Sequence, residues 1–171
     1  MPAYLKYAPA GFPGDITRSD DSNVEPAQYI AASGVFPAGL GLAMKYVTGG
    51  IQQWNGGAET KASFAGINVR EIPGIGGAGS DTDITDGGAP YTSNPAGLLV
   101  RGYAIVNCTH GTPARGGVVY VQVVADTGAP VGSFRADGTD GSNAVALDAV
   151  QAEWASDGVD ANGMAEIRIA R

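Results

Sequence analysis

Apolar and polar positions alternate with period two at several places along the chain, most clearly near its end. Residues 163–170 place apolar side chains on one face and polar ones on the other: Ala165, Ile167 and Ile169 against Met164, Glu166 and Arg168. This period is typical of a β-strand with one buried face. A strand so close to the end of the chain predicts that this end is held in a sheet.

Shorter runs of the same kind predict further strands. Residues 64–71 alternate, and we expect Ile67 and Val69 to point inward and Asn68 and Arg70 outward. Further candidates are residues 28–32, 40–47, 51–54 and 133–136. Residues 98–108 and 118–125 are the richest in β-branched and aromatic residues, and we expect them to form a buried antiparallel pair.

Residues 144–155 fit two patterns. Val145, Leu147, Val150 and Trp154 share one helix face, or they lie on a strand whose register shifts between Leu147 and Val150. The surrounding strands favour the bulged strand. Turn signals such as Gly49-Gly50 and Asn55-Gly56 separate the runs. The pattern predicts a single-domain, all-β fold, an antiparallel β-sandwich or small barrel, with a jelly roll among the topologies that fit.

Two segments depart from this pattern. Residues 1–26 contain closely spaced prolines, which exclude a regular helix, and we expect an extended N-terminal arm before a β domain at 27–171. Such an arm lies on its own domain or reaches a neighbour, and the pattern leaves both open. Residues 73–97 are rich in Gly and Asp and poor in large apolar residues, which predicts a long exposed loop.

Composition narrows the possible partners. The chain of 171 residues carries a net charge of −7, and its Lys and Arg residues are scattered. An acidic chain without a basic patch lacks the features that bind nucleic acid or an anionic membrane. No apolar stretch has the length of a membrane span, and the first residues lack the pattern of a secretory signal. We therefore expect synthesis in a cytoplasm.

Few residues suggest catalysis. The one cysteine, Cys108, lies two positions from the one histidine, His110, and a thiol nucleophile would need such a base. The acidic pairs Asp20/Asp21 and Asp81/Asp83 lie in polar segments that do not favour tuned carboxyls. Residues 81–87 and 137–143 resemble calcium loops without the EF-hand order of ligands. We expect no enzyme, no metal and no cofactor, and a hydrolase using Cys108 and His110 is the weakest alternative.

A binding module is the stronger alternative. Trp54, Trp154 and the seven tyrosines could line a sugar-binding face of a β protein. The chain would then be a glycan- or receptor-binding module of a virion.

The order of several short motifs resembles a known family. These are GDITR at 14–18, VEP at 24–26, AGLGLA at 38–43, FAGINVR at 64–70, G-x-x-V-x-G-Y-x-x-V at 97–106, GVVYV at 117–121, AEWASD at 152–157 and AEIRI at 165–169. Together they resemble the structural cement (head decoration) proteins of tailed bacteriophages. The loop at 74–95 is longer and richer in glycine than this family leads us to expect.

The resemblance implies a non-enzymatic protein on the outer surface of the virion capsid. It would bind between subunits of the major capsid protein, stabilise the shell, and contact neighbouring copies of itself as a dimer or trimer. Residues 2–26 are the segment that we expect to reach a neighbour. The candidate contact residues are Tyr4, Tyr7, Phe12, Asp15 and Arg18.

Overall fold

The computed structural model describes residues 11–30, 39–69, 95–139 and 143–170. These ranges contain antiparallel strands and two single-turn 3-10 helices, η1 (Ser19–Asp21) and η2 (Lys61–Ser63). The strands are β1 (Asn23–Gln28), β2 (Ala43–Val47), β3 (Gly50–Gln53), β4 (Phe64–Val69), β5 (Pro95–Asn107), β6 (Tyr120–Gln122), β7 (Phe134–Arg135), β8 (Ala144–Ala146), β9 (Ala152–Trp154) and β10 (Met164–Ala170). The all-β prediction is confirmed.

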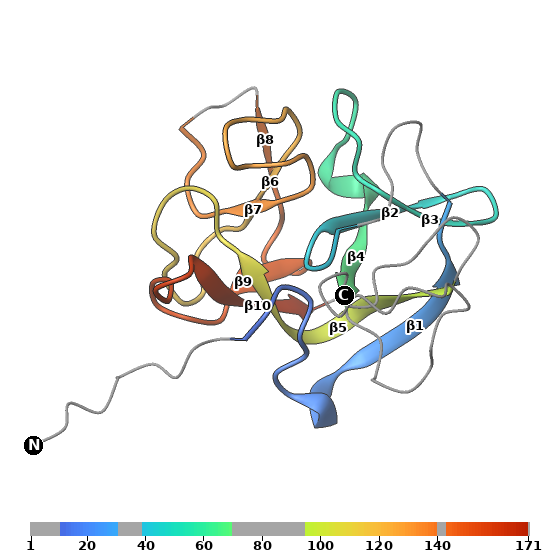
Figure 1. Ribbon diagram of the computed structural model, residues 1–171, viewed down its shortest axis with the longest axis horizontal. Coiled ribbons are helices and arrows are strands. Elements are labelled where there is room, and N and C mark those ends of the chain that lie inside the picture. The colour runs from blue at the N-terminus through green and yellow to red at the C-terminus, as the bar shows by residue number, and fades with distance from the viewer. Residues whose placement is uncertain (1–10, 31–38, 70–94, 140–142, 171) are drawn as a thin grey trace, which may run out of the picture.

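The strands form two antiparallel sheets in a sandwich-like arrangement. The larger sheet has the order β3-β2-β4-β5-β10-β9, with β1 also paired to β5, and the smaller has the order β7-β6-β8. Figure 1 shows β5 running through the middle of the molecule, with the smaller sheet above β9 and β10. The main apolar core contains residues of both sheets, such as Ile67, Val106, Val121 and Phe134.

Strand β5 organises the larger sheet. On one edge it pairs with β4 around Leu99 and with β10 from Arg101 onward. On the other edge it pairs with β1, and further along with residues 14–17, where Ile16 bridges Ala104. Most side chains from Ala96 to Cys108 are buried. A strand covered on its faces must be largely apolar, which explains why 98–108 gave such a strong pattern.

A bulge in β5 changes which side chains face the core. Val24 pairs with Leu99 but Asn23 pairs with Arg101, so Val100 is an extra residue in β5. Leu99 before the bulge and Ala104 after it both join the main core. Because side chains alternate along a strand, one inserted residue is what brings both onto the same face.

The predicted pairing of 98–108 with 118–125 is wrong. Strand β5 pairs with β1, β4 and β10, whereas β6 lies in the smaller sheet between β7 and β8. Composition identified both strands as buried but carries no information about their partners. The connecting segment leaves the larger sheet at Cys108, which bridges Phe134 of β7, so the chain changes sheets before β6 begins.

Residues 144–155 form neither a helix nor one bulged strand. They form β8 and β9, which lie in different sheets and are joined by a turn in which Gln151 N–H donates to the Asp148 carbonyl. Leu147 is buried, whereas Val150 is 74% exposed in the turn. The apparent shift in period therefore marks a chain reversal rather than a bulge.

Asn68 was expected to point outward, and this is also wrong. It is fully buried, and its amide donates to the Gly39 carbonyl at 3.0 Å. Strand β4 lies between β2 and β5 and is covered on both faces, so alternation does not report exposure there. The inward positions of Ile67 and Val69 are confirmed, and Arg70 lies outside the described residues.

The two segments that interrupt the pattern are described in part. Of the expected loop, residues 73–94 lie outside the described ranges, and residues 95–97 begin β5 and pair with β1. Of the expected arm, residues 11–26 lie on their own domain, because residues 14–17 and β1 both pair with β5. Residues 1–10 lie outside the described ranges.

Candidate functional site

The described part of the N-terminal segment begins with a tight turn at Phe12. The Phe12 N–H donates to Asp15 Oδ2 at 2.9 Å, and the Asp15 N–H donates to the Phe12 carbonyl at 3.0 Å. The next bonds join this turn to the sheet, because Gly14 N–H donates to the Ile105 carbonyl and Ile105 N–H donates to the Asp15 carbonyl. The Phe12 side chain is 69% exposed, so the turn holds an aromatic ring toward solvent.

Arg18 is held by its own domain. Its guanidinium lies 3.9 Å from the centre of the Tyr103 ring, a cation–π contact, and its Nη2 is 3.0 Å from Glu166 Oε2. Thr17 Oγ1 donates to the other carboxylate oxygen of Glu166. Of the five candidate contact residues, Asp15 and Arg18 thus make contacts inside the chain, Phe12 is exposed, and Tyr4 and Tyr7 lie outside the described residues.

Beside Arg18 the sheet surface forms a shallow hollow of about 360 Å³, which we call the Arg101 hollow. It is lined by residues of η1, β5 and β10: Asp21, Arg101, Gly102, Tyr103, Arg168, Ile169 and Ala170. Arg101 and Tyr103 alternate along β5, and their partners across the sheet are Ala170 and Arg168. Sequence analysis missed this site, although the spacing of Arg101 and Tyr103 placed both on one face of a strand.

Ion pairing distinguishes Arg101 from the other basic side chains. Arg18 pairs with Glu166, and Arg168 pairs with Glu153 at 2.9 Å. Among residues within the described ranges, Arg101 is the one Lys or Arg without a carboxylate within 4.0 Å; those that have one are Arg18, Lys45, Lys61, Arg115, Arg135 and Arg168. Arg101 is also exposed, so its charge is available to a partner.

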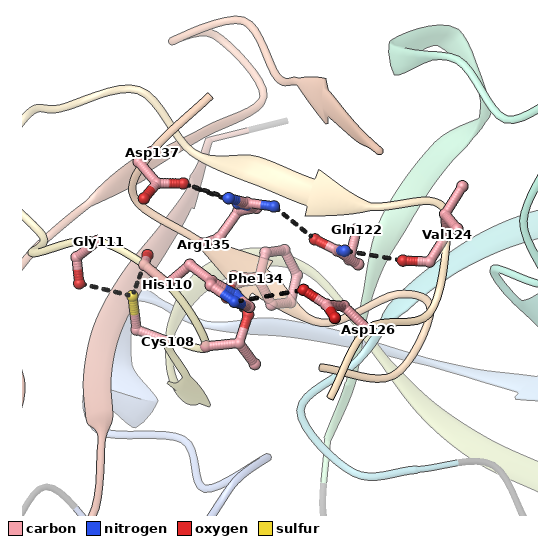
Figure 2. Close-up of polar contacts among 10 residues, drawn as sticks. Cys108, His110, Gly111, Gln122, Val124, Asp126, Phe134, Arg135 and Asp137 are labelled. Atoms are coloured by element: carbon pink, nitrogen blue, oxygen red, sulfur yellow. Dashed lines mark hydrogen bonds and ion pairs between the residues drawn. The ribbon is translucent and has the colours of Figure 1, made fainter. Parts of the chain in front are cut away.

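Cys108 and His110 do not form a catalytic pair. The Cys108 thiol contacts the His110 backbone carbonyl at 3.4 Å, whereas His110 Nε2 faces Asp126 Oδ2 at 3.7 Å (Figure 2). Burial raises the pKa of the Cys108 thiol, and backbone hydrogen bonds at Ala136 and His110 offset this only in part. A thiol nucleophile needs the opposite shift, so this geometry does not support cysteine chemistry.

The polar groups next to Cys108 have a structural role. Arg135 is 1% exposed and pairs with Asp137, while its Nη1 donates to Gln122 Oε1 at 3.0 Å. Gln122 in turn donates to the Val124 carbonyl, which completes the row of contacts seen in Figure 2. The Arg135–Gln122 contact joins β7 to β6, whereas the other two contacts are local to their own segments. A buried charge is tolerated only with such partners.

The remaining candidates give no ligand site within the described residues. Trp54 and Trp154 are fully buried and cannot stack on a sugar. The described ranges contain no group of three His, Cys, Asp or Glu residues able to hold a metal ion, and no helix long and apolar enough to cross a membrane. Asp137 of the second calcium-like segment pairs with Arg135, and residues 81–87 lie outside the described ranges.

Comparison with known proteins shows to which family this chain belongs. The family described as XM1 gp53 minor capsid protein matches residues 1–169. The chain belongs to the XM1 gp53 minor capsid protein family. A chain in the solved capsid of Myoviridae phage XM1 is 19% identical, with a TM-score of 0.62, over 97% of this chain and 94% of that one. That likeness shows a shared fold. No curated protein matches the chain.

Membership in this family confirms the resemblance to phage head structural proteins that the motif order indicated. The description of this family is that of a minor capsid protein. Four of the eight motifs that carried the resemblance overlap β4, β5, β9 and β10 of the larger sheet. The motif GDITR at 14–18 lies in the N-terminal segment and contains two of the candidate contact residues, Asp15 and Arg18.

Proposed function

We propose that this protein is a capsid decoration protein that binds the outer surface of a phage head between major capsid subunits and stabilises the shell. The observation that carries the proposal is the match to a minor capsid protein family over residues 1–169. The site geometry supports it, because the most distinctive exposed features are an aromatic side chain and a polar hollow with an unpaired arginine, both suited to a protein contact.

The N-terminal segment is the contact that we propose for the shell. Residues 14–17 are hydrogen-bonded to β5, which anchors the segment, and Phe12 lies exposed immediately before this anchor. Residues 1–10 would extend from Phe12 onto a capsid subunit, with Tyr4 and Tyr7 as aromatic anchors. Each contact would be modest, but repetition over a symmetric lattice and contact with neighbouring copies, as a dimer or trimer, would add avidity.

The decisive experiment is co-sedimentation of the purified protein with expanded capsids that lack it, followed by electron microscopy of the pellet. We expect saturable binding at regular lattice positions on the outer surface. A parallel heating experiment should show that decorated capsids release their DNA at a higher temperature than bare ones. Protein that stays in the supernatant would contradict the proposal and favour a glycan- or receptor-binding module.

Deletion of residues 2–10 tests the arm without touching the described domain. We expect capsid occupancy to fall while the thermal unfolding temperature of the free protein stays unchanged, because the hydrogen bonds of residues 14–17 are kept. Unchanged occupancy would show that the arm does not bind the shell.

Phe12→Ala tests the anchor by itself. Its matched control is Val150→Ala, which also shortens a strongly exposed apolar side chain, in this case in the turn between β8 and β9. We expect Phe12→Ala to weaken binding about tenfold, as truncation of an aromatic anchor does, and Val150→Ala to bind like the unmodified protein. Equal effects would argue against a specific role for Phe12.

A further inference from the structure

The Arg101 hollow has a shape that the chain itself enforces. Gly102 is one of its lining residues and has a φ of +125°; a Cβ built there would lie 2.4 Å from Ser22 Oγ and 2.7 Å from Ser22 Cα. Across the sheet from Arg101 stands Ala170, whose small side chain leaves space beside the guanidinium. The hollow is therefore a concavity set by close backbone packing, with Arg101 on its wall.

Some of the charged side chains around the hollow have ion-pair partners and others do not. Arg18 and Arg168 are neutralised by Glu166 and Glu153, respectively. Arg101 and Asp21 remain, both exposed and both without an ion pair among the described residues. A ligand that matches the hollow therefore offers a carboxylate to Arg101 and a hydrogen-bond donor to Asp21.

The position of the hollow indicates which partner meets it. Tyr103 forms part of its wall and is covered by Arg18, which follows the Phe12 turn by a few residues. The hollow is thus continuous with the segment assigned to shell binding. The unpaired guanidinium of Arg101 favours an acidic group on the partner, and the adjoining N-terminal segment is the one that we propose binds the shell.

We propose that the Arg101 hollow receives an acidic loop of the major capsid protein. A carboxylate of that loop pairs with the planar guanidinium of Arg101 through two parallel hydrogen bonds, and a backbone N–H or a lysine of the same loop donates to Asp21. This inference rests on the proposed function, because it assigns the shell contact to a particular surface and a particular chemistry.

The test compares capsid binding of the full-length protein with that of charge variants. Arg101→Glu reverses the charge in the hollow, and Arg115→Glu is the matched control because Arg115 is a highly exposed arginine in the loop between β5 and β6. We expect Arg101→Glu to weaken binding at least about tenfold and Arg115→Glu to leave it within about twofold. Arg101→Lys should bind with an intermediate affinity, because lysine keeps the charge but lacks the paired donors.

Salt gives a second readout. The difference in capsid affinity between the unmodified protein and Arg101→Glu should become smaller as NaCl is raised from about 0.05 M to about 0.5 M. An ion pair weakens as the Debye length shortens. A gap that does not change with salt would overturn the ion-pair assignment.

The outcomes separate the two proposals. If the unmodified protein binds and Arg101→Glu binds equally well, or no worse than Arg115→Glu, the hollow is not the contact while the decoration role stands. If the unmodified protein does not bind, the decoration role fails and this inference fails with it. If sedimentation velocity shows that Arg101→Glu dissociates an oligomer of the free protein, the occupant is a second copy and the acidic capsid loop is overturned.

Discussion

At the residue scale, the smaller sheet depends on one buried cation. Arg135 is almost completely buried, and its partners Asp137 and Gln122 come from the chain beyond β7 and from β6. Removing the carboxylate would leave the guanidinium in the interior with weaker compensation, which costs more than the pair contributes when intact.

We expect Asp137→Ala to lower the free energy of unfolding by about 2–3 kcal/mol in urea denaturation. The control is Asp148→Ala, which breaks an ion pair with Lys61 in which both side chains are about half exposed. That loss should stay below about 0.5 kcal/mol, since water replaces the partner at an exposed site. Similar losses for the two variants would show that the burial of Arg135 has no energetic consequence.

Because the Cys108 thiol is buried, we expect the stability of the fold to depend on pH in the alkaline range. Its pKa in the folded chain is raised above its ordinary value of 9.0 by burial, so the folded state holds the proton more tightly than the unfolded state. The resulting stabilisation is fully present below about pH 9 and is lost as the pH rises through the raised pKa. Urea denaturation at pH 7.5, 9 and 10.5 should therefore show a steeper loss of stability for the unmodified protein than for Cys108→Ala. Parallel losses would contradict this.

At the element scale, β5 determines how the larger sheet is assembled. Its bulge at Val100 and the positive φ of Gly102 let one strand present the residues on both sides of the bulge to the same core. The same Gly102 brings β5 against Ser22, next to β1 and the Arg101 hollow. One local irregularity therefore serves both the core and the candidate binding surface.

Gly102→Ala should destabilise the protein by about 3 kcal/mol, because a side chain there combines a strained φ with a clash against Ser22. Gly49→Ala is the control for the backbone conformation alone: Gly49 has a φ of +89°, and a Cβ there meets nothing within 4 Å. We expect the control to lose about 1 kcal/mol. Thermal and urea unfolding measure both, and equal losses would show that close packing at Gly102 is unimportant.

The elements also show where sequence patterns were informative. Strand β10 was predicted together with its inward face because it has one buried side and pairs with regular register. Asn68 was misplaced because β4 is buried on both faces, and the turn at Val150 was read as a register shift. The Arg101 hollow was missed because it is assembled from η1, β5 and β10, and no local pattern reports their approach.

At the scale of the whole molecule, the two sheets share one core. Phe134 of β7 in the smaller sheet and Ile67 of β4 in the larger both belong to it and are fully buried. Sheets that bury their apolar faces against each other lose that burial together, so neither is expected to persist when the other unfolds.

We therefore expect a single unfolding transition, with tryptophan fluorescence and far-ultraviolet circular dichroism superimposing. Trp54 and Trp154 report on the end of β3 and on β9, respectively, both in the larger sheet. Phe134→Ala in the smaller sheet should shift both signals together and cost about 3–5 kcal/mol. A tryptophan signal that stays in place while the circular dichroism shifts would show that the sheets unfold independently.

Local sequence patterns were sufficient to predict the fold class, most of the strands and the resemblance to phage head proteins. Alternation and turn residues act over a few positions, and the order of motifs along the chain can be compared with a known family without knowing which segments are in contact. The folded chain, in contrast, is needed to see that β5 pairs with β10 and β1 rather than with β6 and that 144–155 divides between two sheets. It is also needed to see that Arg101 and Asp21 line one hollow. Those features depend on contacts between segments far apart in the chain, where strands of equal apolar character compete for the same edge and packing selects the partner.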